Sequence, residues 1–495
     1  MSNLSELLPS GGAQNVVEFV ASGAIGNGKT VILNSNGTVT VVASTTVSES
    51  IPAGSLTNAN AASSSAIVSA FDPNVANRFV IAYNTSSIGK ARVGTVSGTS
   101  LSFGAEATFN SGATGAYNSI QFDPNTAGKF IISFTDDGNG AKGTATVGTV
   151  SGTSLSFGSE YIFNSGTTYW SSLAFDPNTS GLFVLAYEDA GSANKGTAIS
   201  GTLSGTALSF GTEAVFETSA TQITTVAFDP NVANKFVIAY RKQTNTHGLA
   251  IVGTVSGSSI SYGSTYTFNA AATGDHISLS MDPINANKFI IAYKDTGNSG
   301  SGTCIIGTMS GTNTLSFGSE FVFNSGNTPA INVAFSLQVA NKFAVGYRNQ
   351  GSSSVGTVVI GLVSGSGITY GTPSVVQSAV TSDISVIFSN TLGKFIFNCK
   401  DDGSSGHAFS AVCQMGAVTT NLTSTNLMGI SAEAIASGAT GEINVLGGLN
   451  EGQSSLTPAS IYYVQGNGTI TTASASPAQK IGQAISSTKL NLVDL

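Results

Sequence analysis

The sequence FDPNVANRFVIAY, residues 71–83, is the stretch that decides the fold. Recognisable copies of it return about every 53 residues, and the seven copies begin at Phe71, Phe122, Phe175, Phe228, Met281, Phe335 and, in a degraded form, Phe388. We number the repeats one to seven by these landmark residues. A repeat of this length is typical of propellers, solenoids and arrays of small modules. The pattern inside each repeat has to decide between these architectures.

Each repeat reads as two β-hairpins. A short apolar run meets Asp-Pro-Asn and a second apolar run follows, which indicates a tight turn, because Pro sets the turn angle and Asp accepts hydrogen bonds from the following amides. A third run then meets a Ser-Gly-Thr turn, and a fourth begins at Leu-Ser-Phe-Gly. Copies of this second hairpin start at Ser97, Ser151, Ser204, Ser256, Ser310 and Ser364. Four antiparallel strands per repeat predict a propeller blade.

The last repeat lacks its second hairpin, and the chain has a spare strand at its other end. Residues 46–51, TVSESI, resemble SFGSEYI at residues 156–162, which belongs to a fourth strand. We expect this N-terminal strand to complete the seventh blade, because ring closure removes two exposed sheet edges. The predicted fold class is all-β: a seven-bladed β-propeller closed by an N-terminal strand, plus a small β-barrel or sandwich domain.

The repeats are expected to form a propeller domain over residues 46–418. The flanking segments 1–45 and 419–495 also contain short apolar runs and hairpin turns, but neither has enough apolar residues for a core alone. We expect the two segments to combine into one split β docking domain. Residues 1–14 read as a short leader with a helical turn at residues 4–8.

The course of the chain through a blade predicts two different faces. Because the chain runs up and down four times, the Asp-Pro-Asn and Ser-Gly-Thr turns share one face, which we call the lower face. Both connections to the docking domain are expected to leave from that face. The opposite, upper face should then stay free.

The composition excludes several classes of partner. Charged residues make up only 9% of the chain and Gly supplies 59 of 495 residues, which indicates a turn-rich β-protein with a neutral polar surface. With Lys+Arg 18 against Asp+Glu 26 and a net charge of -8, a nucleic-acid partner is not expected. No run approaches the roughly 20 apolar residues that span a bilayer, and the start lacks a secretion signal, so membrane insertion is not expected.

Motifs for catalysis, cofactors and metals are weak. Residues 23–30, GAIGNGKT, match the phosphate-loop pattern, but a strand-like run and an Asn-Gly turn follow where that loop needs a helix. Cysteines and histidines occur without metal-binding or catalytic spacing, and the cysteines are expected to be buried thiols. These residues are Cys304, Cys399, Cys413, His247, His276 and His407.

Paired acidic residues could suggest glycoside cleavage. They are Asp136-Asp137, Glu188-Asp189 and Asp401-Asp402, and they occupy the same loop of separate repeats. Solvation explains polar residues in such loops without any chemistry. We therefore expect a protein that is not an enzyme, with no catalytic residue, no metal and no cofactor.

Two positions vary within the repeats where the chain meets the upper face. Directly after the second strand the residues are Asn84, Thr135, Glu188, Arg241, Lys294, Arg348 and Lys400. Five residues before each landmark they are Ala66, Tyr117, Trp170, Ile223, His276, Ala330 and Asp383. Aromatic and polar groups around a shallow depression suit sugar rings or a protein partner. The predicted ligand-binding residues are Tyr117, Trp170, His276, Asp383, Arg241, Lys294, Arg348 and Lys400; unconstrained drift is the alternative interpretation.

The sequence segments on either side of the repeats resemble those of structural proteins of tailed bacteriophages. The opening ELLPSGGAQNVVEFVASGAI with VILNSNGTVTVV is similar to modules that bracket many tail-fibre-like or virion surface proteins. So is the close MGISAEAIASGATGEINVLGGLNEGQSSLTPASIYYVQGNGTI, ending in IGQAISSTKLNLVDL. The repeat text FDPNxANKFVIAY with GTVSGTSLSFG is similar to propellers found beside such modules. No catalytic residue carries over from this resemblance.

The resemblance implies a virion component on the exterior surface of the particle, on its tail or as a head appendage. A docking module would bind other virion proteins, with a homo-oligomer expected, and the propeller would face host surface glycan or protein. A purely structural head or tail decoration or nozzle protein is the first alternative. An enzyme that acts on polysaccharide is the second.

Overall fold

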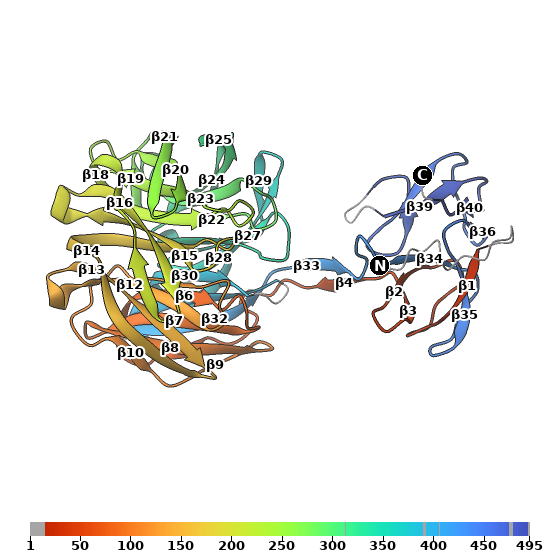
Figure 1. Cartoon of the computed structure of the whole chain (residues 1–495), viewed down its shortest axis with the longest axis horizontal. Coiled ribbons are helices and arrows are strands. Elements are labelled where there is room, and N and C mark those ends of the chain that lie inside the picture. The colour runs from red at the N-terminus through yellow and green to blue at the C-terminus, as the bar shows by residue number, and fades with distance from the viewer. Residues whose placement is uncertain (1–14, 312, 390–392, 405, 475–478, 494–495) are drawn as a thin grey trace. The chain divides into compact units, whose positions relative to one another are not determined.

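The computed structural model describes residues 15–493 apart from residues 312, 390–392, 405 and 475–478. Within these residues the chain consists of β-strands, with 3-10 turns as its helical structure (Figure 1). It folds into two compact units, one formed by Ser48–Gly416 and the other by the segments on either side. The predicted helical turn at residues 4–8 lies outside the described residues.

The larger unit is a β-propeller whose strands follow one another in sequence order. In repeat one, β6 (Ser64–Phe71), β7 (Arg78–Thr85) and β8 (Ile88–Ser97) form an antiparallel sheet. Both β9 (Ser100–Phe103) and β10 (Ala107–Asn110) then pair with β8. The all-β propeller fold that the repeats predict is therefore confirmed.

The same order returns through the rest of this unit. Repeats two and three use β11 (Ser119–Phe122), β12 (Lys129–Asp136), β13 (Lys142–Ser151), β14 (Ser154–Phe175), β15 (Leu182–Asp189), β16 (Lys195–Ser204), β17 (Ala207–Phe210) and β18 (Ala214–Phe228). Repeats four and five use β19 (Lys235–Lys242), β20 (Gly248–Ser256), β21 (Ser259–Asn269), β22 (Thr273–Met281), β23 (Lys288–Asp295), β24 (Ser301–Ser310) and β25 (Thr314–Asn327). Repeats six and seven use β26 (Ile331–Phe335), β27 (Lys342–Asn349), β28 (Val355–Ser364), β29 (Gly367–Tyr370), β30 (Ser374–Phe388), β31 (Lys394–Asp401) and β32 (His407–Gln414).

Short 3-10 turns follow the second strand in several repeats. They are η2 (Asp137–Asn139), η3 (Ala190–Ser192), η4 (Thr296–Asn298), η5 (Gln350–Ser352) and η6 (Asp402–Ser404). Three long strands, β14, β18 and β30, leave the outer edge of one sheet and form the inner strand of the next. Neighbouring blades are thus joined without an intervening loop at these points.

The Asp-Pro-Asn turn ties each blade to its neighbour. The carboxylate of Asp176 is fully buried, and its Oδ1 accepts a hydrogen bond of 2.8 Å from the amide of Asn178 inside the turn. Its Oδ2 accepts a bond of 2.7 Å from the amide of Asn234 in the next repeat. The side chain of Asn178 donates to the carbonyl of Pro230, also in the next repeat, at 3.1 Å. The motif that marks the repeat in the sequence is therefore the contact between blades.

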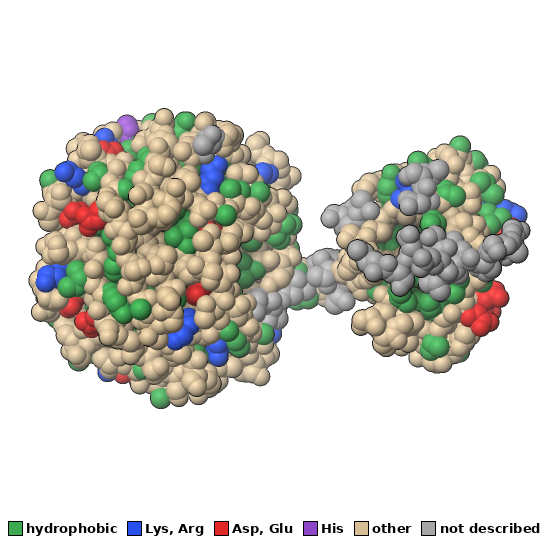
Figure 2. All heavy atoms as spheres, viewed as in Figure 1, with side chains coloured by type: hydrophobic (Ala, Val, Ile, Leu, Met, Phe, Trp, Pro, Cys, Tyr) green, Lys and Arg blue, Asp and Glu red, His purple; other side chains and the backbone are tan. Residues whose placement is uncertain are grey.

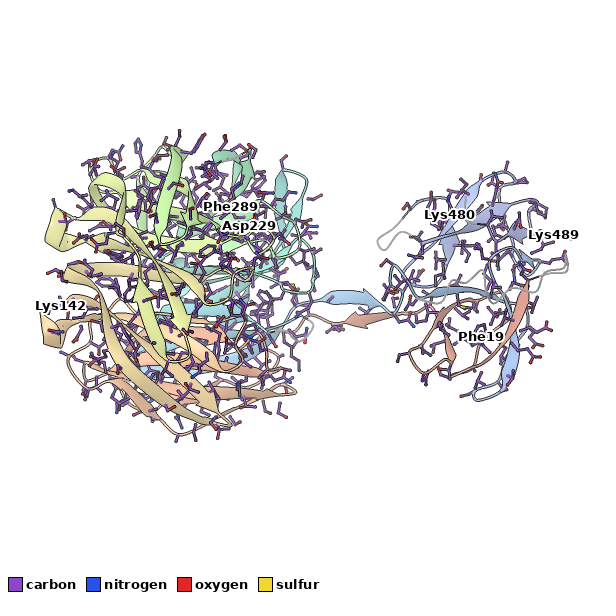
Figure 3. The ribbon with its side chains drawn as sticks, viewed as in Figure 1. Phe19, Lys142, Asp229, Phe289, Lys480 and Lys489 are labelled. Carbon is purple, nitrogen blue, oxygen red and sulfur yellow. The ribbon has the colours of Figure 1, made fainter. Side chains whose placement is uncertain are left out.

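The propeller core consists of aromatic rings packed against glycines. The Phe289 ring lies over Gly307 of the adjacent strand, where a Cβ atom would come within 2.1 Å of the ring. Farther along β23, the buried Tyr293 hydroxyl donates to Glu320 at 2.7 Å. Figure 3 shows Phe289 inside the larger unit, as it does Asp229 of an Asp-Pro-Asn turn. These positions recur in other repeats, so the periodic sequence specifies a periodic core.

The strand that completes the sheet of β31 and β32 is not the predicted one. β5 (Thr57–Asn60) pairs with β32, with Asn60 opposite Ala408. Most of the predicted strand, residues 46–51, lies elsewhere: β4 (Ser44–Val47) pairs with β33 (Ala417–Thr420), and Ser50 makes only an isolated bridge to Gln414. The prediction that residues 46–51 complete this sheet was therefore wrong, because residues 57–60 do so.

A side-chain hydrogen bond explains why residues 57–60 take this place. In repeat two, Asn164 ends the outer-strand segment and donates to Thr168, four residues later, at 3.0 Å. Asn60 donates in the same way to Ser64 at 3.1 Å. The sequence TNAN at residues 57–60 thus corresponds to YIFN at residues 161–164. Additional residues separate it from residues 46–51, the segment that resembles SFGSEYI at residues 156–162.

The smaller unit combines strands from both ends of the chain. One sheet has the order β1 (Val16–Val20), β35 (Thr440–Asn444), β34 (Leu427–Ser431), β2 (Thr30–Leu33) and β3 (Val39–Val41). A second sheet has the order β36 (Leu449–Asn450), β40 (Leu490–Asn491), β39 (Gln479–Ala484), β37 (Ile461–Val464) and β38 (Ile470–Thr471). Phe19 of β1 packs against the core of the first sheet (Figure 3). The phosphate-loop-like segment leads into strand β2 and not into a helix, so it lacks the helix N-terminus that a phosphate loop needs.

We expect Asp176→Ala to destabilise the propeller unit by about 2–4 kcal/mol, because it leaves amides of two blades without their buried acceptor. The matched control is Asp176→Ser. Repeats six and seven carry Ser at this position, and the Ser336 hydroxyl still accepts from the amide of Val339 at 3.0 Å. Calorimetric melting of the full chain should rank wild type above Ser above Ala. Equal melting temperatures for Ala and wild type would contradict the linking role.

Ala59→Asp should destabilise the propeller unit by more than about 3 kcal/mol, because Ala59 is fully buried in strand β5 and a charge there has no partner. The same change at Ser48, which is exposed in the segment that the sequence favoured for closure, should leave the melting temperature unchanged. Thermal melting followed by size-exclusion chromatography measures both effects. The opposite ranking would show that residues 46–51 complete the sheet.

Candidate functional site

The variable positions that precede the inner strands share an uncommon backbone conformation. Five of them have positive φ angles although they are not glycine: Ala66 (52°), Trp170 (52°), Ile223 (57°), Ala330 (53°) and Asp383 (47°). In several repeats the register between the first two strands shifts at this point, as between Tyr169 and Ser172. Left-handed conformations of such residues are energetically unfavourable and concentrate at functional sites.

Two of the predicted aromatic residues come together. The rings of Tyr117 and Trp170 have centroids 4.4 Å apart and an angle of 43°, and both side chains are half-buried. The carbonyl of Tyr117 accepts a bond of 3.2 Å from Ser171, and the carbonyl of Trp170 accepts one from Thr224 in the next repeat. Neighbouring blades therefore fix the backbone on which this aromatic pair stands.

Tyr169 extends the aromatic pair, and sequence reasoning missed it. Its ring lies edge-on to Tyr117 with centroids 5.6 Å apart. The only signal in the sequence was its place directly before Trp170, because the series of variable residues took one position per repeat. We call Tyr117, Tyr169 and Trp170 the aromatic cluster.

Glu188 lies beside the aromatic cluster as a buried acid. It pairs in register with Tyr169 and is only 4% exposed, and its Oε2 has no hydrogen-bond partner among the described residues. Burial raises the pKa of Glu188 to about 7, and the positive charge of Arg241 opposes this rise. The carboxyl group can therefore donate or accept a hydrogen bond near neutral pH.

Arg241 occupies the equivalent position in the next repeat. Its guanidinium donates to Gln222, its register partner, and to the carbonyl of Thr273 at 3.5 Å. Burial lowers its pKa, which the negative charges of Asp275 and Glu188 oppose. Its Nε is buried without a partner among the described residues, as is that of Arg348. Each of these arginines thus buries one N–H donor that has no acceptor among the described residues.

The other predicted cations have nearby acids. Lys294 Nζ lies 3.5 Å and His276 Nδ1 lies 3.1 Å from Asp275, and the adjacent His276 and Lys294 hold the pKa of Asp275 below its usual range. Lys400 Nζ lies 3.0 Å from Asp402. Carboxylates that the variable series did not include therefore compensate much of the predicted positive rim.

Asp383 belongs to a different part of the upper face from Glu188. Its Oδ2 accepts a hydrogen bond of 3.0 Å from the amide of Ala66, and burial raises its pKa against the positive charge of Lys400. The electrostatic effect of His276 reaches Asp383 as well. The structure thus brings Tyr117 and Arg241 near Glu188, and it brings Lys400 and His276 near Asp383. Asp275 links the two sets, because it lies beside His276 and also acts on Arg241.

Two members of the acidic pairs, Asp189 and Asp401, have structural roles. Asp189 accepts from Asn164 at 3.3 Å, and Asp401 accepts from Gln377 at 2.8 Å. In the described part of the chain, no three His, Cys, Asp or Glu side chains are grouped so that they could hold a metal ion. Nor does any described helix have the length and apolarity to span a membrane. On the face shown in Figure 2, charged side chains are scattered over an otherwise uncharged surface.

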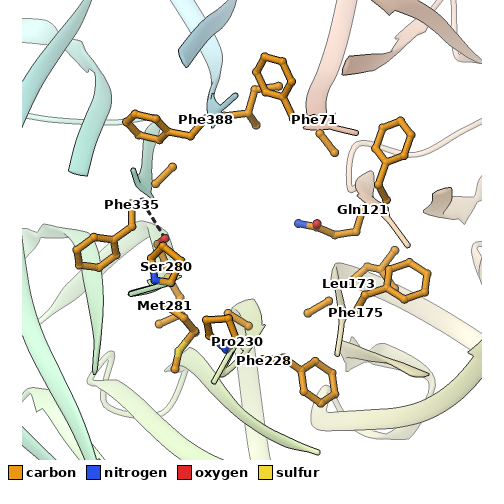
Figure 4. Close-up of a pocket in the computed structure, with 18 of the residues that line it drawn as sticks. Phe71, Gln121, Leu173, Phe175, Phe228, Pro230, Ser280, Met281, Phe335 and Phe388 are labelled. Atoms are coloured by element: carbon orange, nitrogen blue, oxygen red, sulfur yellow. Dashed lines mark hydrogen bonds between the residues drawn. The ribbon is translucent and has the colours of Figure 1, made fainter. Parts of the chain in front are cut away.

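A cavity of about 470 Å³ lies on the propeller axis, between the inner strands and the Asp-Pro-Asn turns. Figure 4 shows landmark residues such as Phe71, Phe228 and Phe335 arranged around a central opening, with Gln121 directed into it. Ser280 in its wall accepts a bond of 3.0 Å from the amide of Phe335. The serines here serve contacts between blades, so the cavity offers few free polar groups.

No protein-family model matches the sequence, and no curated protein matches it either. Solved structures do match. Sqt1 of Saccharomyces cerevisiae is 12% identical, with 74% of this chain and 100% of that chain covered and a TM-score of 0.45. Sqt1 of Chaetomium thermophilum, bound to the N-terminus of the ribosomal protein L10, is 13% identical over 72% and 89% of the two chains, with a TM-score of 0.44. The Dos1 propeller is 12% identical over 73% and 94%, with a TM-score of 0.43.

Glu188→Gln is expected to raise the melting temperature by roughly 2 °C at pH 8.5 and to change it little at pH 5. The folded-state pKa of about 7 lies above the ordinary value of 4.5, so the folded protein holds a proton that the unfolded chain releases. The protonated carboxyl group stabilises the fold at low pH, and this contribution is lost as the pH rises through about 7.

The control for this titration is Glu49→Gln, at an exposed glutamate of the same unit. It should show no pH-dependent difference from wild type in differential scanning fluorimetry. A Glu188→Gln effect of the same size at both pH values would mean that the carboxyl group stays ionised throughout.

Proposed function

We propose that this chain is a bacteriophage virion protein without enzymatic activity, carried on the exterior surface of the particle. In this proposal it is a tail-fibre-like or surface adhesin that presents the upper face of its propeller to a glycan or protein of the host. The resemblance of the flanking segments to modules of phage virion proteins supports the virion setting. The arrangement of the upper face supports the adhesin role.

The proposal assigns one blade to each of the seven repeats, with β5 as the outer strand of the last blade. Pairing of β5 with β32 supports this closure. The smaller unit, built from both ends of the chain, would dock on other virion proteins and form a homo-oligomer. One of its sheets contains strands from both ends of the chain, with β1 paired to β35, and this supports a single folded module.

One observation carries the adhesin proposal. Glu188, Arg241 and Arg348 each bury a polar atom that has no partner among the described residues, and all three belong to the variable series of the upper face. Buried charged groups are normally hydrogen-bonded, because an unsatisfied one costs about 1–3 kcal/mol or more. The blade contacts of the lower face satisfy their buried acids, as at Asp176. Uncharged side chains elsewhere, such as Gln338 in the turn of repeat six, also bury an atom without a partner among the described residues. The unsatisfied atoms of Glu188, Arg241 and Arg348 are those of charged groups, and they support a surface built for a ligand.

A second candidate function has its own observation. The outer strands expose one aliphatic side chain at the same position in four repeats: Ile162 (46%), Val215 (45%), Val322 (44%) and Val375 (50%). Apolar groups repeated around a rim favour lateral packing between subunits. A purely structural head or tail decoration or nozzle protein would use this rim and not the upper face.

Trp170→Ala and Arg241→Ala should each abolish most adsorption of the full-length protein to host cells while the protein stays folded. The reason is that hot spots of recognition are enriched in Trp and Arg. The control is Val215→Ser on the outer rim, which should adsorb like wild type. Flow cytometry of labelled protein on the bacteria that propagate the particle measures all four proteins.

Two results would contradict the adhesin role. Wild-type protein that adsorbs no better than either upper-face variant would exclude recognition by this face. Normal adsorption of all variants combined with loss of particle assembly in Val215→Ser would favour the structural alternative.

A further inference from the structure

We propose that the upper face binds an uncharged sugar ring, with the aromatic cluster as its platform and Glu188 and Arg241 as its hydrogen-bonding pair. This inference rests on the proposed function and specifies its ligand. The two alternatives to be distinguished are an acidic sugar at the same place and a ligand bound in the axial cavity.

The aromatic cluster has the form of a platform and not of a closed cage. The centroid distance of 4.4 Å between Tyr117 and Trp170 leaves no room for a group between the two rings. Both residues are half-buried, so part of each ring stays accessible. A pyranose can place its C–H face on such a surface, because the electron-rich faces of aromatic rings attract C–H groups.

The platform is held in place before any ligand arrives. Trp170 packs against the core cluster that contains Ile223, its carbonyl accepts from Thr224, and its backbone is left-handed. The carbonyl of Tyr117 is bonded to Ser171. Side chains ordered in advance lose little conformational entropy on binding, which favours affinity for a small ligand.

Glu188 and Arg241 supply complementary unsatisfied atoms beside the platform. Glu188 Oε2 has an unused acceptor, and Arg241 Nε has an unused donor. Glu188 acts electrostatically on both Tyr117 and Arg241, so the carboxyl group lies near both residues. Both atoms are buried in the free protein, so a sugar hydroxyl reaches them only with a small shift of the side chains that cover them. It would then donate to the first and accept from the second, and two buried groups would be satisfied at once.

The charge balance of the site favours a neutral ligand. Asp275 lies beside Lys294 and His276 and also acts on Arg241, while Glu188 acts on Arg241 and on Tyr117 of the platform. Glu188 and Arg241 have opposite charges when both are ionised, so a charged group on the ligand would be attracted to one of them and repelled by the other. A neutral hydroxyl can bond to both, because it donates and accepts.

Trp170 makes a direct experiment available. It is the only tryptophan among the 495 residues, so the intrinsic tryptophan fluorescence of the full-length protein reports on the platform alone. The probes are the methyl glycosides of glucose, galactose, mannose, N-acetylglucosamine and N-acetylgalactosamine, up to about 50 mM, with methyl glucuronide as the acidic probe. At least one neutral glycoside should shift the emission saturably, with at least about tenfold weaker binding of the glucuronide.

Four variants test the residues. Tyr117→Ala removes half of the platform but keeps the reporter, and it should weaken binding at least about tenfold. Glu188→Ala should also weaken binding, whereas Glu188→Gln, which keeps an acceptor, should weaken it less. Gln121→Ala, in the axial cavity, should bind like wild type.

The inference is overturned if no neutral glycoside shifts the emission, if the glucuronide binds as well as the best neutral glycoside, or if Tyr117→Ala binds normally. A loss of binding in Gln121→Ala would overturn it too, because the sugar would then depend on the axial cavity. If one of these results is obtained but adsorption to host cells still requires Trp170, the adhesin proposal remains valid. Absence of adsorption would instead remove the proposed function.

Discussion

The buried carboxylate of the Asp-Pro-Asn turn is the interaction on which the propeller depends. One oxygen of Asp229 closes its own turn by accepting from Asn231, and the other accepts from Asn287 of the next repeat. A buried acid is tolerated only where hydrogen bonds replace its lost hydration. Because the two acceptor roles fall on different blades, this residue fixes the local turn and the position of the neighbouring sheet together.

This constraint gives the two faces of the propeller different freedom. On the lower face, the residue after the landmark is restricted to a hydrogen-bond acceptor: it is Asp in repeats one to five and Ser in repeats six and seven. On the upper face, the residue before the inner strand keeps its backbone position while its side chain ranges from Ala66 to Trp170. Chemical variety on a rigid, repeated frame is the arrangement that recognition sites need, because the frame holds each side chain in a fixed direction.

Sequence reasoning predicted those parts of the structure that local chemistry specifies. Turns, hairpins and the repeated order of strands follow from Pro, Asp and alternating apolar residues within a few positions of one another. The strand that completes the last sheet was misplaced, because residues 57–60 pair with a segment near the other end of the chain. The feature that marks this strand is the hydrogen bond from Asn60 to Ser64. It can be matched to the bond from Asn164 to Thr168 in repeat two only when the pairing of the strands is known. Partners such as Asp275 for Lys294 were missed for the same reason.

The buried acids of the lower face and Glu188 of the upper face differ in how fully they are hydrogen-bonded. This chain has few charged residues, and where it buries them in the frame it surrounds them with donors, as at Asp176. Glu188 is almost as buried, yet one of its oxygens has no partner within the described residues, and burial raises its pKa. Drift at an unconstrained position would more easily yield a small or solvated side chain than an energetically costly one. A buried acid with a free oxygen, beside ordered aromatic rings, therefore argues for selection of the site by a ligand.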